Sequence, residues 1–239
     1  MTDHRILNSE EHRELRVLTD SSAELGDAVM GCLTVPLEFR RVQSCFPIVF
    51  RRDPETDAFS AMALFGFTNG ENLFLVDGKW DARYKPLAQS IQPFLVGRSR
   101  DDDAAGQVHV DMEHPRISQS GEGMRVFDED GQATPYLEEI AAQLGMLHEG
   151  YQSSAGFFEA MKRYDLLEPF SVEVPLADGS KHSLVGFHTI HEERLAALSG
   201  DELAVLQQGG HLLPIYMALA SIDNFAELVA RKNRQVMSG

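Results

Sequence analysis

The spacing of apolar residues changes near residue 133, and this change limits the folds that the chain can adopt. Before that point, short apolar segments rich in aromatic and β-branched residues alternate with Gly, Asp and Asn. This pattern is typical of strands joined by turns. The first region, residues 1–132, is therefore expected to be mainly antiparallel β. The expected strands are residues 28–35, 47–51, 58–67, 72–76, 93–96, 107–112 and 123–127.

After residue 133 the apolar residues recur three and four positions apart, which predicts a long helix over 134–167. Thr134 is the expected N-cap and Pro135 suits the first turn, while Gly150 and Gly156 are places where the helix could divide. A strand pair over 169–190 and helices over 191–198, 200–210 and 211–234 follow. We therefore predict an α+β protein whose C-terminal region, 133–239, is helical with one β-hairpin. The two regions form either separate units or one compact domain.

Three Asp-Gly pairs predict tight hairpin turns, because a type I′ turn needs positive φ at both central residues. They are Asp77-Gly78, Asp130-Gly131 and Asp178-Gly179. The first pair lies in NLFLVDGKWDARYKP and places Trp80, the only tryptophan of the chain, on the return strand. At the third pair, Phe170, Val172, Val174 and Leu176 share one face, opposite Leu184, Val185 or Phe187 according to the register.

The surroundings of Trp80 mix aromatic and charged side chains, and two interpretations stay open. An indole beside charged groups can form one wall of a ligand pocket, with the charges fixing the ligand's orientation. Alternatively, the aromatic rings close one end of a β-core. The candidate ligand-binding residues are Trp80, Tyr84, Arg83, Glu71 and Asn72.

The charge of the chain argues against nucleic acid and anionic membrane surfaces as partners. Its 37 acidic and 21 basic residues give a net charge of −16, and the basic residues form no block. The acidic run at residues 101–103 is interpreted as a solvated loop. The N-terminus lacks the pattern of a signal segment, and no uninterrupted apolar run approaches ~20 residues. We therefore expect a cytoplasmic protein without membrane insertion, with Cys32 and Cys45 as free thiols.

One catalytic alternative starts from QVHVDMEH, where His109 and Asp111 share a strand face. A distal His182, His188 or His191 would complete the two-His-one-carboxylate face of an Fe(II) oxygenase, with Arg194 holding an oxo-acid co-substrate. In HTIHEERL, capping of a helix by Thr189 is the simpler interpretation. Nucleophile-elbow, P-loop and dinucleotide motifs are absent from the sequence, so the leading interpretation assigns no catalytic residue, metal or cofactor.

Several segments resemble the bacterial SapC family in order along the chain. They include VPLEFRRVQSCFPIVFRRD, the stretch 63–96, VFDEDGQATPYLEEIAAQL and residues 166–233. The most specific part is the pattern Gly-x-Trp, Tyr, Pro, Pro-Phe. One departure concerns the residues before Pro-Phe, which are basic in the family but Gln89 and Gln92 here, so an anion-binding role is not expected. The pattern residues are Gly78, Trp80, Tyr84, Pro86, Pro93 and Phe94.

The resemblance implies a role but no chemistry. The family takes its name from a surface-layer gene cluster, and its genes are often found beside TonB-dependent outer-membrane receptors, cupin-like proteins and tryptophan-halogenase-like flavoproteins. It carries no established activity or catalytic residues. The expected function is therefore that of a non-catalytic accessory protein, which binds a protein partner or small molecule of a surface-layer or uptake system.

Overall fold

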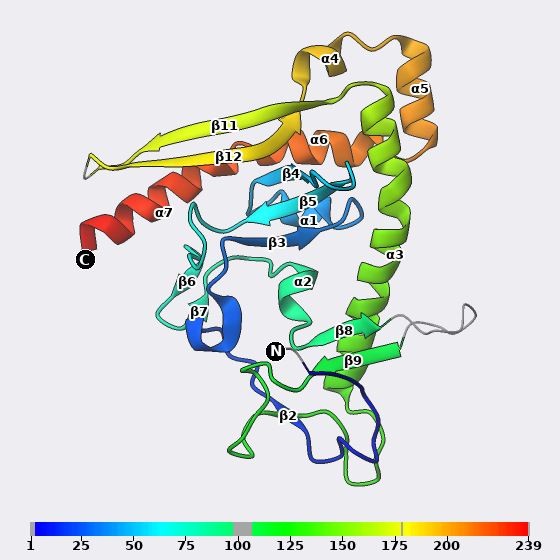
Figure 1. Cartoon of the computed structure of the whole chain (residues 1–239), viewed down its shortest axis with the longest axis vertical. Helices are drawn as coiled ribbons and strands as arrows, with labels where there is room; N and C mark the ends of the chain where they lie inside the picture. The colour runs from blue at the N-terminus through cyan, green and yellow to red at the C-terminus, as the bar shows by residue number, and fades with distance from the viewer. Residues whose placement is uncertain (1–2, 98–106, 178, 239) are drawn as a thin grey trace. The chain divides into compact units, whose positions relative to one another are not determined.

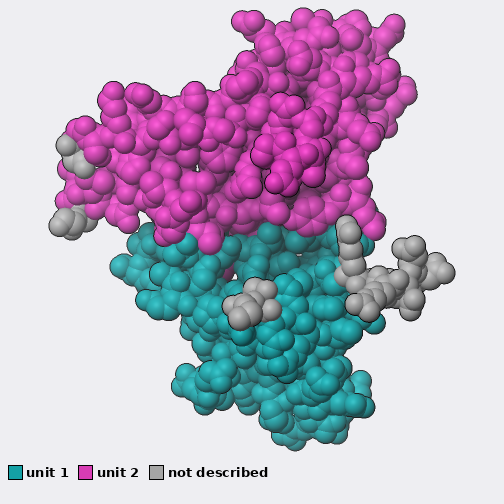
Figure 2. Space-filling model, in the orientation of Figure 1, with its two compact units in different colours: residues 1–28, 75–80, 87–149 teal, residues 29–74, 81–86, 150–239 magenta. Residues whose placement is uncertain are grey.

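The computed structural model describes residues 3–97, 107–177 and 179–238. Its helices and antiparallel sheets confirm the α+β class (Figure 1). The chain forms two compact units, shown in different colours in Figure 2. Unit 1 comprises residues 1–28, 75–80 and 87–149, and unit 2 comprises 29–74, 81–86 and 150–239. The division of the sequence into regions 1–132 and 133–239 stays a prediction.

Unit 2 contains a five-stranded antiparallel sheet in the order β11-β12-β4-β5-β3. Both faces of its central strand β4 are covered, since Ile48, Val49 and Phe50 are all fully buried. Aromatic rings fill the space beside it, and Phe157 makes an edge contact with Phe39 at 5.9 Å between ring centroids. The strands are β3 (Gly31–Thr34), β4 (Ile48–Arg52), β5 (Phe59–Leu64), β11 (Leu167–Pro175) and β12 (Lys181–Ile190).

The hairpin β11–β12 is the β-insertion expected in the helical region (Figure 1, yellow). Its register pairs Phe170 with Phe187 and Val172 with Leu184, with a bulge between the two pairs. Val185 is thereby excluded from the apolar face, and 68% of it is exposed. Asp178 lies outside the described residues, so the turn expected at this Asp-Gly pair is not described.

The described residues of unit 1 form three small antiparallel sheets. One has the order β1-β9-β8, one pairs β2 with β10, and one pairs β6 with β7. β1 and β2 were not expected, and β6 covers only part of the predicted strand 72–76. The strands are β1 (His4–Ile6), β2 (Arg16–Val17), β6 (Leu75–Val76), β7 (Lys79–Trp80), β8 (Phe94–Gly97), β9 (Gln107–Asp111) and β10 (Met124–Arg125).

The long helix α3 (Pro135–Arg163) is continuous, and Thr134 Oγ1 accepts from the Leu137 N–H at 3.4 Å as expected of an N-cap. Gly150 does not divide the helix. A glycine is needed at this position because of close packing, since an added Cβ would lie 2.5 Å from Val35 Cγ2. The other helices are η1 (Ala23–Asp27), α1 (Phe39–Val42), α2 (Leu87–Ser90), α4 (Glu192–Ala196), α5 (Gly200–Gln208), α6 (Leu212–Ser221) and α7 (Asn224–Ser238).

The expected helix 211–234 is two helices, α6 and α7, separated at residues 222–223. In the part of the chain that the structure describes, the segment Leu212–Met237 is long and apolar enough to cross a membrane by length and composition alone, with a hydropathy of 1.4. Uninterrupted apolar runs did not indicate this segment, because Asp223, Asn224 and Glu227 interrupt it. The mean hydropathy includes these three residues and is still high. Core helices of soluble proteins pass the same test, so the absence of membrane insertion stays a prediction.

A buried ion pair lies at the centre of unit 1. Asp27 is fully buried and accepts hydrogen bonds from Arg116 Nη2 at 2.6 Å, Gln89 Nε2 at 2.8 Å and the Ser22 N–H at 3.0 Å. A buried carboxylate is tolerated only when such partners replace its hydration. Three separate segments are therefore joined at one point. Arg116 Nη1 also donates, at 2.8 Å each, to the carbonyl oxygens of Leu18 and Asp20.

We expect Asp27→Ala to lower the free energy of unfolding of unit 1 by about 3–5 kcal/mol, because it leaves the Arg116 guanidinium buried without its counter-charge. Urea unfolding followed by Trp80 fluorescence measures this, since Trp80 belongs to unit 1. Lys181→Ala is the matched control: its ion pair with Glu173 is 68% and 70% exposed, so the change should stay below about 0.5 kcal/mol. Equal effects of the two variants would contradict the assigned role of the buried pair.

His114 makes unit 1 sensitive to pH. Burial, and then the charge of Arg116, lower the pKa of His114 below its ordinary value of 6.5. The unfolded chain therefore binds a proton at this histidine more readily than the folded chain does. The contribution of neutral His114 to the free energy of unfolding is complete above about pH 6.5 and is lost as the pH falls below that value. We expect His114→Gln to flatten the wild-type stability profile between about pH 7.5 and 5. Urea midpoints across this range measure it, and parallel profiles would contradict it.

Candidate functional site

The expected hairpin carrying Trp80 is present. Strand β6 pairs with β7, with Leu75 opposite Trp80, and the turn has positive φ at both Asp77 (49°) and Gly78 (70°). These angles are those of a type I′ turn, which confirms the prediction from the Asp-Gly pair. Trp80 is half-buried, and the neighbouring Lys79 is exposed. The indole therefore presents part of its surface to solvent from a strand with a defined conformation.

The chain segments that flank this hairpin belong to unit 2 and are held there by Arg231 of α7. Arg231 donates to Asp81 Oδ2 at 2.7 Å and to the Asp81 carbonyl oxygen at 3.1 Å. Its guanidinium also lies 4.3 Å from the centre of the Phe74 ring, in cation–π geometry. The Asp81 N–H donates to the Phe74 carbonyl oxygen at 2.7 Å. Arg231 thus contacts the last residue before the hairpin, Phe74, and the first residue after it, Asp81.

Two predicted site residues, Glu71 and Asn72, make contacts within unit 2 that fix the loop before the hairpin. Glu71 accepts from the Phe67 N–H at 2.8 Å and from Lys232 Nζ at 2.6 Å. The buried Asn72 accepts from the Phe74 N–H at 3.0 Å through its side-chain oxygen. Side chains that satisfy backbone N–H groups in this way are typical of tight loops. These contacts account for both residues without a ligand.

Tyr84 forms a hydrogen bond with Glu38, a residue that was not identified from the sequence. The Tyr84 hydroxyl donates to Glu38 Oε1 at 2.7 Å, and Thr34 Oγ1 donates to Glu38 Oε2 at 2.8 Å. Only 4% of Glu38 is exposed. Burial, followed by the Glu38 charge, raises the pKa of Tyr84 well above its ordinary value, so the phenol keeps its proton. The one available sequence signal was a carboxylate within the apolar stretch VPLEF.

The five predicted residues do not form one described cluster. Trp80 belongs to unit 1, whereas Glu71, Asn72, Arg83 and Tyr84 belong to unit 2. Arg83 is exposed and donates to the Ser44 carbonyl oxygen at 3.4 Å. Their role as a ligand-binding set stays a prediction.

The residues of the oxygenase hypothesis make structural contacts. Asp111 accepts through Oδ1 from the N–H groups of Asp3 at 3.2 Å and Glu113 at 3.1 Å. His109 lies against Gly97 in the neighbouring strand. Within residues 3–97, 107–177 and 179–238, no three His, Cys, Asp or Glu side chains gather as a metal site requires. The described residues therefore lack the three-ligand face that this hypothesis needs.

The distal histidines have other surroundings. His191, rather than Thr189, caps α4, because His191 Nδ1 accepts from the Arg194 N–H at 3.4 Å. Arg194 Nε in turn donates to the Tyr164 carbonyl oxygen at 3.0 Å. The guanidinium that the hypothesis assigned to an oxo-acid co-substrate therefore already has a backbone partner. His188 makes an edge contact with Phe59, and burial lowers the pKa of His188. His182 faces the ring of Phe67.

The SapC family model matches residues 7–228, which include the Trp80 hairpin and every described strand except β1. The chain belongs to the SapC family. No curated protein and no solved structure matches it. The SapC match ends before Arg231 and Lys232, so the α7 contacts to the hairpin segment lie beyond the matched residues. Family membership assigns no activity to any of these side chains.

We expect Arg231→Ala to loosen the segments that flank the hairpin without unfolding the protein, because it removes the hydrogen bonds to Leu73 and Asp81 and the contact with Phe74. The amide of Asp81 should exchange its hydrogen roughly 10-fold faster, as expected for a local loss of about 1.4 kcal/mol. Hydrogen exchange resolved at this amide measures the effect. Arg234→Ala on the same helix is the control, since Arg234 is 62% exposed in its ion pair with Glu227. Unchanged exchange at Asp81 in Arg231→Ala would refute the assigned role.

Proposed function

We propose that this SapC-family chain is a non-catalytic cytoplasmic accessory protein, which binds a protein partner or small molecule of a surface-layer or TonB-dependent uptake system. We propose further that the bound molecule contacts Trp80. The proposal extends family membership, which alone is established, to a physical role.

The half-buried indole of Trp80 is the observation that carries the proposal. A large aromatic side chain fixed on a type I′ hairpin loses little conformational entropy on binding, and aromatic residues dominate the energetics of most interfaces. The contacts of Arg231 with Asp81 and Phe74 restrict the hairpin further. A rigid, partly exposed ring favours recognition over chemistry.

The acidic charge of the chain supports the choice of partner. A net charge of −16 repels phosphate backbones and anionic lipid surfaces, and long-range charge governs which molecules approach. Candidate ligands are therefore neutral or cationic molecules. Surface-layer sugars and peptides of uptake receptors are the first to test.

The test uses Trp80 as its own reporter. Its fluorescence is titrated with sugars and with peptides from surface-layer and uptake-receptor proteins, and a saturable change in intensity is expected for at least one of them. Trp80→Ala should then weaken binding of that molecule about 10-fold or more, in line with the loss of an aromatic contact. Tyr216→Ala is the matched control, because Tyr216 is an exposed aromatic residue of α6.

No fluorescence change across the panel, or equal affinity of Trp80→Ala and wild type by calorimetry, would remove the site from consideration. Cell fractionation tests the remaining part of the proposal separately. We expect the chain in the cytoplasmic fraction, and recovery with membranes or outside the cell would contradict that location.

A further inference from the structure

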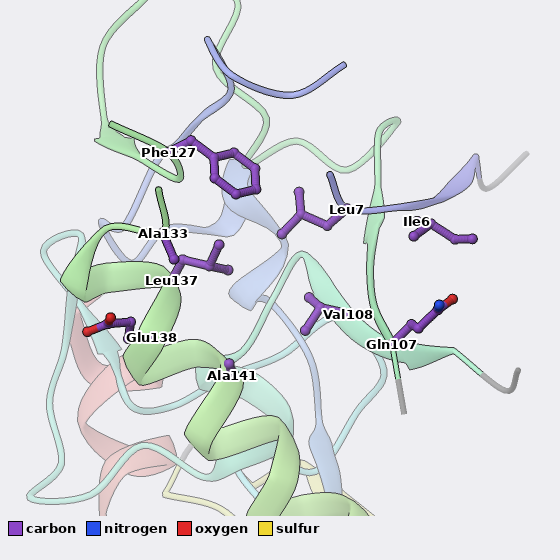
Figure 3. A pocket seen from close by; sticks show the side chains of 9 residues that line it. All are labelled: Ile6, Leu7, Gln107, Val108, Phe127, Ala133, Leu137, Glu138 and Ala141. Atoms are coloured by element: carbon purple, nitrogen blue, oxygen red, sulfur yellow. The ribbon is translucent and has the colours of Figure 1, made fainter. Parts of the chain in front are cut away.

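Unit 1 contains an open groove of about 380 Å³ that the Trp80 hairpin does not line (Figure 3). Its wall is apolar except for Gln107 and Glu138, which lie at opposite ends of the view in Figure 3. The volume is within the range of about 300–1,000 Å³ that is usual for ligand sites. The lining residues are Ile6, Leu7, Gln107, Val108, Phe127, Ala133, Leu137, Glu138 and Ala141.

The groove leaves apolar surface in contact with water. Ile6, at one side of it, is 50% exposed, whereas Phe127 and Leu137 are 8% and 6% exposed. Contiguous exposed apolar surface at a concave site is typical of binding regions. An apolar side chain of another molecule would remove this surface from water, and the buried Phe127 and Leu137 provide a firm floor for it.

A strand edge lies beside the groove, and of its outward groups the Ile6 carbonyl oxygen accepts from Asn8 Nδ2 at 3.3 Å. Among the residues that the structure describes, β1 is at the edge of its sheet and pairs with β9 alone. The Leu7 N–H donates to the Val108 carbonyl oxygen at 2.9 Å, so by the alternation of an antiparallel ladder the peptide N–H groups of His4 and Ile6 point away from β9. Such an edge can pair with an extended peptide whose alternate side chains enter a neighbouring pocket.

The charges around the groove are mainly negative. Glu138 lines it, and the turn 128–132, which joins the lining residues Phe127 and Ala133, carries Glu129 and Asp130 as exposed carboxylates. The nearby positive charges are Arg13, whose guanidinium approaches Gly131, and Arg5 of β1, which is paired with Asp3 at 2.6 Å. This balance favours a cationic partner, and charge complementarity of this kind sets both the association rate and the choice of partner.

We propose that this groove binds an extended basic peptide segment of a partner protein. An apolar side chain of the segment fills the space between Leu137 and Val108, a flanking Lys or Arg pairs with Glu138, and the peptide backbone extends the sheet at β1. The site is independent of the function proposed for Trp80, so either can fail without the other.

The probe is a fluorescein-labelled synthetic peptide in which Lys alternates with Leu and Val. Fluorescence polarisation with the full-length chain should show at least about 10-fold tighter binding than for two control peptides, one with Glu in place of Lys and one with Ser in place of the apolar residues. Added salt should weaken the interaction with the basic peptide. Trp80→Phe should leave it unchanged.

Two groove variants have matched controls on the same helix. Ala141→Trp fills the groove and should weaken binding of the basic peptide at least about 10-fold, whereas Ala142→Trp, at the next exposed position, should not. Glu138→Lys reverses the charge in the groove and should weaken binding roughly fivefold. Glu149→Lys makes the same change at an exposed site away from the groove and should alter affinity less than about twofold.

Three results would overturn the proposal. One is that the basic peptide does not bind, or binds no better than the control peptides. Another is that both groove variants bind it as the wild type does. The third is that sedimentation shows a dimer which Ala141→Trp converts to monomers, because the groove would then be covered by a second copy of this chain.

Discussion

The buried pair of Asp27 and Arg116 is the constraint on which unit 1 depends. A carboxylate and a guanidinium removed from water need nearly every hydrogen-bonding position filled, and backbone or amide groups from residues 18–22 and Gln89 fill them. The sheets of this unit have strands of two to five residues, which are too short to hold a fold by pairing alone. The ion pair supplies a fixed point between segments that are distant in sequence. Gly78, at the hairpin turn, lies near the Ser21 carbonyl oxygen beside this network.

Unit 2 is stabilised differently, by a continuous apolar core around a sheet covered on both faces. Its charged side chains fix connecting segments: Arg231 and Lys232 of α7 bind Asp81 and Glu71. The hairpin 75–80 leaves unit 2 between these two contacts. The segments on both sides of the hairpin are thus fixed by helix side chains that come about 150 residues later in the chain.

Sequence patterns predicted those features that depend on local physics. The Asp77-Gly78 turn was predictable because positive φ is a property of the residues themselves, and the strand and helix periods follow from burial of one face. The short strand β1 was not predictable, because its own sequence is charged and its conformation depends on pairing with the distant residues 109–111. Gly150 was considered a helix break from propensity, yet contact with Val35 requires a residue without a side chain there. Tertiary packing outweighed propensity at that position.

The candidate sites show the same limit more sharply. Proximity in sequence grouped Glu71, Asn72, Arg83 and Tyr84 with Trp80, and the structure adds that each of these four has partners within unit 2. The partners are backbone groups, Lys232 and the buried Glu38. The groove of unit 1 has the opposite character. Its walls come from residues 6–7, 107–108 and five positions between 127 and 141, and no sequence pattern indicated that these segments meet. Such a concave surface exists only after distant segments pack. Its shape therefore could not be predicted from any one of these segments.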